Sequence, residues 1–374
     1  MKIKKILTSI RWFTLFLIVF ISINSCQKES SDTLTGPAIE GSIVHLDKLE
    51  QGKVYKLNDY PLFVMSYRGD YGFSRFLKTG IREIVGEKIN NPDWGCTCFT
   101  GMVNNKIFGR NFDYYHHIAL ALYTHPRNAF ASLSIVDLYY LGFNESSSAN
   151  QIENSNSVSN APFWPMDGIN EKGVAIGQMA LPYADPPYDP SKRSLNCLEI
   201  IRLVLDYASN TDEAVSLIQQ YNYNVNGGPP VHFMIADKSG KSAIIEFINK
   251  EMKVIYNNEP YHVSTNFIIT GSLAPQTTDC WRYNKAYSDL KNAGGSIDET
   301  AAMNILQSVS QSITMWSAVY NLNTPSLNIS TGKDYSKDYK LLFSNTLYSS
   351  IVETTWQVVS TFKPIYKVRV IKIF

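Results

Sequence analysis

The side chains best suited to chemistry lie in one short stretch of the chain. Cys96 directly follows Gly95, and Arg110 and Asp113 come a few residues later. A thiol attacks carbonyl carbon as the thiolate, and a free cysteine has a pKa of about 8.5, so a working cysteine needs a base or a positive neighbour. Arg110 and Asp113 can fill those roles, or they can form a surface ion pair. The pattern therefore predicts a nucleophilic Cys96, against the alternative of a buried structural thiol.

A hairpin is predicted to position these groups. Asn104-Asn105 suits a two-residue type I′ turn, because Asn tolerates positive φ. This turn sets Cys96 opposite Asp113, with Cβ atoms about 5 Å apart. The same alternation puts Arg110 on the other face, so its contact with the thiol would need a bulge or a bent strand end.

The hairpin motif resembles a known family. Gly95-Cys96-Thr97-Cys98-Phe99, then Phe108-Gly109-Arg110-Asn111-Phe112-Asp113, is similar to the start of the mature chain in the choloylglycine hydrolase family. That family of N-terminal nucleophile hydrolases includes bile salt hydrolases, penicillin V acylases and acid ceramidase-like amidases. Further similar motifs follow in order: Asp167–Gly173 ("D-G-x-N-E-K-G"), Asp237–Glu246 ("D-x-x-G-K-S…E"), Thr265-Asn266 and Trp281-Arg282-Tyr283.

The resemblance implies self-cleavage between Gly95 and Cys96. Cys96 would then carry a free α-amine, whose pKa of about 7.7–8.0 makes it a usable base near neutral pH. Arg110 would favour the thiolate, and Asp113 would orient the amine.

The resemblance also assigns roles to Asn266 and Arg282. Asn266 would donate to the oxyanion, and Arg282 would help hold the Cys96 end of the site. Read without the family, they are a strand-end Asn and a helix-face Arg. A second oxyanion donor of the family aligns near Ala180, which cannot donate, so Gln178, Tyr183 or a backbone N–H would have to serve.

The expected reaction is hydrolysis of a linear, non-peptide C–N amide bond in a small N-acyl substrate. A rival of the same chemistry is an acyltransferase of the isopenicillin N acyltransferase type, in which an amine resolves the thioester. A rival of another class is a lipoprotein that keeps the fold for ligand binding, with little turnover.

Residues 1–25 have a basic start and a short apolar run, which is typical of a signal peptide. Ile23-Asn24-Ser25-Cys26 resembles a bacterial lipobox, with Cys26 as the lipidated residue; the alternative is a plain secretory signal. We expect a tether over 26–38, a pro-segment or small subunit over 39–95, and the amidase domain over 96–374. The predicted location is the cell envelope, on either face of the outer membrane, with the membrane contacted through the lipid.

The composition and the residue spacing limit the classes of partner and ligand that we expect. A net charge of +1 over 374 residues gives no electrostatic footprint for nucleic acid. The sequence has no C-x-x-C and no His/Cys metal spacing, so neither a metal nor a cofactor is expected. His116 and His117 would point to opposite faces of a strand, so they would not bind one metal ion without further ligands.

Cys98 is the alternative nucleophile. An oligomer is compatible with the sequence.

The order of predicted elements gives the fold class. Blocks of strands and helices, without βαβ alternation, predict an α+β fold of four layers, αββα, with two stacked antiparallel sheets between helices. A Ser/Asn-rich stretch over 144–160 is predicted to be a surface loop. Helices are expected over 71–86, 195–208, 212–221, 281–291 and 299–308, with Thr211 as the N-cap of the third.

Overall fold

The computed structural model describes residues 39–40, 42–81, 95–115, 118–225, 228–272 and 278–343. The predicted signal peptide, Cys26, the tether and His116-His117 lie outside these residues. Within the described part of the chain, no helix is long and apolar enough to span a membrane.

Two large sheets form the centre of the fold. Among the described residues, sheet I has eight strands in the order β1 (Ile39–Glu40), β2 (Ile43–His45), β19 (Tyr339–Leu342), β18 (Ser326–Thr331), β17 (Thr314–Asn321), β6 (Ile107–Asp113), β5 (Gly95–Gly101) and β16 (Tyr261–Ser264). Sheet II has nine, in the order β15 (Glu251–Tyr256), β14 (Ser242–Ile248), β13 (Val231–Ala236), β10 (Ala175–Ala180), β9 (Pro165–Asn170), β8 (Ser132–Asp137), β7 (Ala119–His125), β4 (Leu62–Arg68) and β3 (Val54–Lys56). A short parallel pair joins β11 (Ser194–Leu195) to β12 (Asn222–Tyr223).

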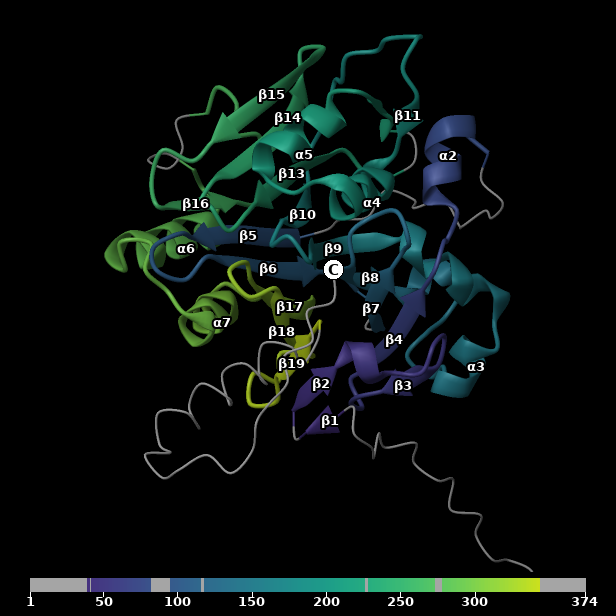
Figure 1. The fold of residues 1–374 in the computed structure, drawn as a ribbon. Coiled ribbons are helices and arrows are strands. Elements are labelled where there is room, and N and C mark those ends of the chain that lie inside the picture. The colour runs from purple at the N-terminus through teal and green to yellow at the C-terminus, as the bar shows by residue number, and fades with distance from the viewer. Residues whose placement is uncertain are drawn as a thin grey trace, which may run out of the picture. The chain divides into compact units, whose positions relative to one another are not determined.

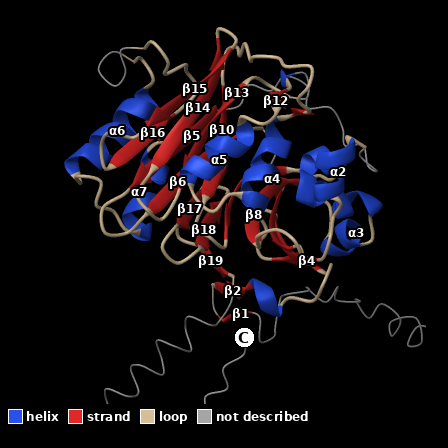
Figure 2. Cartoon of the chain, turned by 45° about the horizontal axis from the view of Figure 1, so that its top comes forward, coloured by secondary structure: helices blue, strands red, loops and turns tan. Residues whose placement is uncertain are grey.

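Helices cover the outer faces of both sheets. Figures 1 and 2 show α6 (Trp281–Asn292) and α7 (Glu299–Ser308) beside sheet I. These two helices contact β16, β5, β6 and β17, whereas α4 (Cys197–Tyr207) and α5 (Thr211–Ile218) contact β9, β10, β13 and β14 of sheet II. Strand β10 contacts β5, so the two sheets face each other. The predicted four-layer αββα sandwich is confirmed.

The segment before Cys96 is part of both sheets. Its strand β2 pairs in parallel with β19 of sheet I, and β4 pairs in parallel with β7 of sheet II. These pairs depart from the antiparallel pattern expected for both sheets. The remaining pairings within the two sheets are antiparallel over the described residues.

Two local predictions need correction. The stretch 144–160 is not a plain loop, because it holds α3 (Ala149–Glu153) and the start of a 3-10 helix (Asn156–Phe163). Ser148 forms a capping box with Gln151, which shows why a Ser-rich stretch can start helices. The N-cap of α5 is Asn210, whose side chain accepts from the Glu213 amide, while Thr211 begins the helix.

Helices α4, α6 and α7 begin and end within about two residues of their predicted positions, whereas α2 is shorter than predicted. Helix α2 (Phe73–Thr79) ends at Gly80 in the left-handed conformation, well before the predicted end at 86. Two further 3-10 turns span Leu46–Lys48 and Leu138–Leu141.

Candidate active site

The hairpin has a different register from the predicted one. Strand β5 pairs with β6 so that Cys96 lies opposite Phe112, and Asp113 lies opposite Gly95. The predicted pairing of Cys96 with Asp113 is therefore wrong by one residue. A shift of one residue moves a whole set of side chains to the other face of a sheet.

The connection between the strands explains the shift. The backbone amides of Met102 and Val103 donate to the carbonyls of Pro260 (2.8 Å) and Gly295 (3.1 Å), so they are not available for the predicted two-residue turn. Asn104 alone takes the positive φ, at 59°. The turn therefore spans Met102–Lys106, and tertiary contacts fix its length.

The new register brings Arg110 to the thiols without a bulge. Arg110 lies directly opposite Cys98 and on the same face as Cys96, between the two sheets. Its Nη2 is 3.8 Å from the Cys96 sulfur, and its Nη1 is 3.5 Å from the Cys98 sulfur. All three side chains are fully buried. On the facing strand, Gly177 leaves room for them, since a Cβ there would lie 3.2 Å from both Arg110 Cδ and Cys98 Sγ.

Asp167 fixes the guanidinium of Arg110. The Asp167 carboxylate accepts from Arg110 Nε at 2.6 Å, from Trp316 Nε1 at 3.1 Å and from the Tyr320 hydroxyl. Arg110 also donates to the backbone carbonyl of Gln178. The prediction missed Asp167 as a site residue, although it is the first residue of the "D-G-x-N-E-K-G" motif.

Burial raises the pKa of both thiols in the intact chain. Burial raises the pKa of Cys96, and the positive charges of Arg110 and Arg282 only partly offset this effect, while Asp113 adds to it. The pKa of Cys98 is raised to about 12, again mainly by burial, despite a hydrogen bond from Arg110. The intact site holds a thiol beside a cation, and among the described residues no basic side chain other than Arg110 is seen to contact the Cys96 sulfur.

The backbone of Cys96 is held by the two residues expected from later in the chain. Its N–H donates to Asn266 Oδ1 at 2.7 Å, and its carbonyl accepts from Arg282 Nη1. Arg282 also donates to Asn266 Oδ1 (2.9 Å) and to Thr97 Oγ1 (3.0 Å). In the last residue pair of β16 and β5, Ser264 lies opposite Cys98. The same register, continued by two residues, places Asn266 opposite Cys96.

The donor end of Asn266 is already occupied in this structure. Its Nδ2 donates to the Ala180 carbonyl at 2.9 Å. The geometry therefore aims the acceptor of Asn266 at the nitrogen that cleavage would turn into the α-amine.

Asp113 lies on the other face of the hairpin, toward the α6–α7 layer. Its carboxylate accepts from Thr314 Oγ1 at 2.5 Å and Gln311 Nε2 at 2.6 Å, and lies 4.0 Å from Arg282 Nη1. A Cβ on Gly95 would lie 2.3 Å from Gln311 Nε2 and 3.0 Å from Asp113 Oδ2. A larger residue at position 95 would therefore displace the Gln311 side chain and crowd the Asp113 carboxylate.

Gln178, one of the two side chains considered as a second oxyanion donor, points away from the thiol. Because Gly177 faces Arg110, the next residue, Gln178, points to the opposite face of sheet II. There its Nε2 contacts Met166 Sδ at 3.7 Å. Tyr183 is 51% exposed. The Gln178 suggestion is therefore wrong, since strand alternation turns that side chain away.

The comparisons with known proteins agree on one family. Residues 96–268 match the model of linear amide C–N hydrolases, choloylglycine hydrolase family. The chain is 31% identical over 182 residues to a bile salt hydrolase/transferase of Lactiplantibacillus plantarum, covering 46% of this chain and 52% of that protein. It is 35% identical over 111 residues to a penicillin V acylase of Pectobacterium atrosepticum, covering 27% of this chain and 29% of that one. The match thus spans about half, or less, of these relatives' length.

Solved structures of the same kind are similar to the chain. A penicillin V acylase from Agrobacterium tumefaciens covers 64% of this chain and 83% of its own, with a TM-score of 0.44 and 16% identity. The match to a conjugated bile acid hydrolase variant from Clostridium perfringens covers 66% of this chain and 92% of that protein, with a TM-score of 0.47 and 15% identity.

The fold and the site together define a four-layer αββα protein with a buried, arginine-flanked cysteine at the start of a central strand. Residues 96–268 match the model of the choloylglycine hydrolase family, the family that the motifs of the hairpin and the later strands resemble.

Proposed function

We propose that the protein is a linear amide C–N hydrolase that activates itself by cutting between Gly95 and Cys96. The observation that carries this proposal is the placement of the Cys96 nitrogen, 2.7 Å from Asn266 Oδ1, at the residue where the family match begins. An acceptor in that position holds a backbone N–H before cleavage and an α-amine after it.

The self-cleavage step balances with the groups present. The Cys96 sulfur attacks the Gly95 carbonyl carbon, the Gly95–Cys96 C–N bond breaks, and the thiol proton goes to the departing nitrogen. Water then hydrolyses the thioester, which leaves a Gly95 carboxylate and a free thiol. Arg110, 3.8 Å from the sulfur, stabilises the developing thiolate.

Turnover would repeat this chemistry on a substrate. The free α-amine takes the thiol proton, the sulfur attacks the amide carbonyl, and the same proton is passed to the leaving amine. Water then releases the acyl group as a carboxylic acid. Relatives described as bile salt hydrolase/transferase and penicillin V acylase support a small N-acyl amide as the substrate class.

Acyl transfer is the second candidate, because one relative is described as a transferase as well as a hydrolase. Incubating the purified protein with penicillin V or a glycine-conjugated bile salt, with and without taurine as acceptor, separates the two. Free acid alone indicates hydrolysis, and a new N-acyl product indicates transfer. If neither substrate is consumed by the cleaved protein, these substrate classes are excluded.

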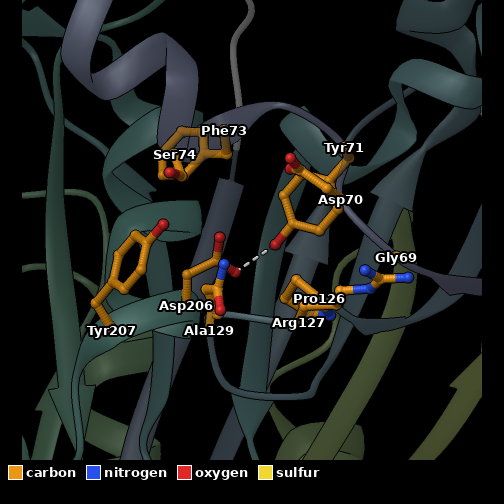
Figure 3. Close-up of a pocket in the computed structure, with 11 residues that line it drawn as sticks. Gly69, Asp70, Tyr71, Phe73, Ser74, Pro126, Arg127, Ala129, Asp206 and Tyr207 are labelled. Carbon is orange, nitrogen blue, oxygen red and sulfur yellow. Dashed lines mark hydrogen bonds between the residues drawn. The ribbon is translucent and has the colours of Figure 1, made fainter.

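We also propose that the segment over 39–95 stays bound after cleavage as a small subunit. Its strand β4 is mostly buried and lies between β7 and β3 within sheet II. A cavity of about 450 Å³ is lined by residues of this segment and of the main body. Within it, the Tyr71 hydroxyl donates to Asp206 Oδ1 at 2.5 Å, the contact drawn as a dashed line in Figure 3. The two fragments should co-elute under native conditions and separate only in denaturant.

The envelope location remains a proposal that rests on the N-terminal sequence. We propose that Cys26 carries the lipid and that residues 26–38 tether the enzyme to the outer membrane. Membrane fractionation of cells expressing the full chain and its Cys26→Ala variant tests this, and equal partition of both into the soluble fraction would contradict it.

A further inference from the structure

A buried polar cluster fixes the loop that carries Asn266. His232 of β13 and Glu246 of β14 lie next to each other across the two strands, and both side chains are fully buried. His232 Nδ1 is 3.1 Å from Glu246 Oε1, and His232 Nε2 is 2.7 Å from the carbonyl of Thr265. The cluster thus reaches from sheet II to the residue directly before Asn266.

Glu246 holds the far end of the same loop. Its Oε1 accepts from the backbone N–H of Ile269 at 2.7 Å, and its Oε2 accepts from that of Thr270 at 2.8 Å. Burial opposes ionisation of Glu246, but the hydrogen bonds from His232, Thr270 and Ile269 prevail and lower its pKa. The loop is therefore held on both sides of Asn266 by one carboxylate–imidazole pair.

The hydrogen-bond roles leave little freedom in this arrangement. Both ring nitrogens of His232 have polar partners: Nδ1 faces the Glu246 carboxylate, and Nε2 faces the Thr265 carbonyl and the Ser264 hydroxyl, 3.1 Å away. Buried polar groups of this kind are costly to leave unpaired, and a fully paired network resists displacement. Nothing in the cleavage or hydrolysis steps above uses either residue.

We infer that His232 and Glu246 are positioning residues, which act through Asn266 to keep its Oδ1 on the Cys96 nitrogen. This inference rests on the proposed function for its effect on turnover. A small displacement of a reacting group can cost about 100-fold in rate. Loss of the pair should therefore lower kcat by about that factor while KM changes little, because neither side chain contacts the thiol.

Glu246→Gln is the sharpest test, since it keeps the shape and replaces one acceptor oxygen with a donor group. His262→Gln is the matched control: His262 lies on β16 and contacts Ser242 Oγ of β14 at 3.1 Å. Glu246→Gln should lower kcat about 100-fold, and His262→Gln should stay within about two-fold. In an Asn266→Ala background, adding Glu246→Gln should cost less than about two-fold more, because effects that pass through one residue do not multiply.

The inference would be overturned if Glu246→Gln lowered kcat by the same factor in the wild-type and Asn266→Ala backgrounds. It would also be overturned if Glu246→Gln lowered kcat no more than His262→Gln does. A wild-type protein that neither cleaves nor turns over substrate would instead contradict the proposed function. In that case, the positioning role is tested separately, by backbone hydrogen exchange in the Cys96→Ala chain. The amide of residue 96 should exchange at least about ten-fold faster with Glu246→Gln than with His262→Gln, and equal rates refute the role.

Discussion

The buried ion pair between Arg110 and Asp167 gives a prediction whose size follows from the structure. Both side chains are fully buried, and Nε lies 2.6 Å from Oδ2. Asp167→Asn keeps the shape and one acceptor oxygen, which can serve Trp316 on Oδ2 or Tyr320 on Oδ1, and it leaves the Arg110 charge without a counter-charge. Removing one partner of a buried pair typically costs about 3–5 kcal/mol of unfolding free energy.

The measurement is urea unfolding followed by tryptophan fluorescence, in the Cys96→Ala background so that every variant is a single chain. The control is Asp212→Asn, which breaks an ion pair to Lys241 of similar length, 2.6 Å, with side chains 58% and 43% exposed. Exposed ion pairs contribute about 0–1 kcal/mol to the free energy of unfolding, so Asp212→Asn should lower it by less than about 1 kcal/mol.

A second variant separates the charge from the packing. Arg110→Met combined with Asp167→Asn leaves no buried net charge, so it should recover most of the loss of the single Asp167 change. If Asp167→Asn costs no more than Asp212→Asn, or if the double variant is worse than the single one, the role given to this ion pair is wrong.

Three further predictions concern the thiols, the cleavage site and pH. Cys96→Ala should abolish both self-cleavage and turnover, whereas Cys98→Ala should keep cleavage, as mass spectrometry will show; the reverse pattern would make Cys98 the nucleophile. Gly95→Val should block cleavage, because a Cβ there would lie 2.3 Å from Gln311 Nε2 and 3.0 Å from Asp113 Oδ2, and both side chains would have to move; normal processing on a denaturing gel would contradict the packing argument. Burial raises the pKa of Asp206 from 3.8 to about 6 against the opposing effects of Arg202 and Tyr71. The folded state therefore holds this proton more tightly than the unfolded chain, so stability falls by about 2 kcal/mol as pH rises from 4 to 6. Asp206→Asn should flatten that part of the urea-stability profile, and an unchanged slope would exclude Asp206 as its source.

Elements with strong local patterns could be predicted from the sequence. Helix α7 was expected over 299–308 and spans Glu299–Ser308, because its apolar positions and its acidic first turn are local signals. The residues that meet at Cys96 were also found, through short motifs that keep their order along the chain.

The register of the hairpin could not be predicted, for a physical reason. Asn104-Asn105 favours a two-residue turn locally, but the amides of Met102 and Val103 are bound by carbonyls far along the sequence. The part played by Asp167 has the same origin, since its partner Arg110 lies 57 residues away. Local propensity fixes elements, whereas tertiary hydrogen bonds decide which face their side chains occupy.

The most direct test of the account is the mass and N-terminal residue of the purified protein. We predict two fragments that co-purify under native conditions, the larger beginning with Cys96, and a single intact chain for Cys96→Ala. A wild-type chain that stays uncut between Gly95 and Cys96, yet hydrolyses an N-acyl amide as fast as a cut one, would contradict the central claim.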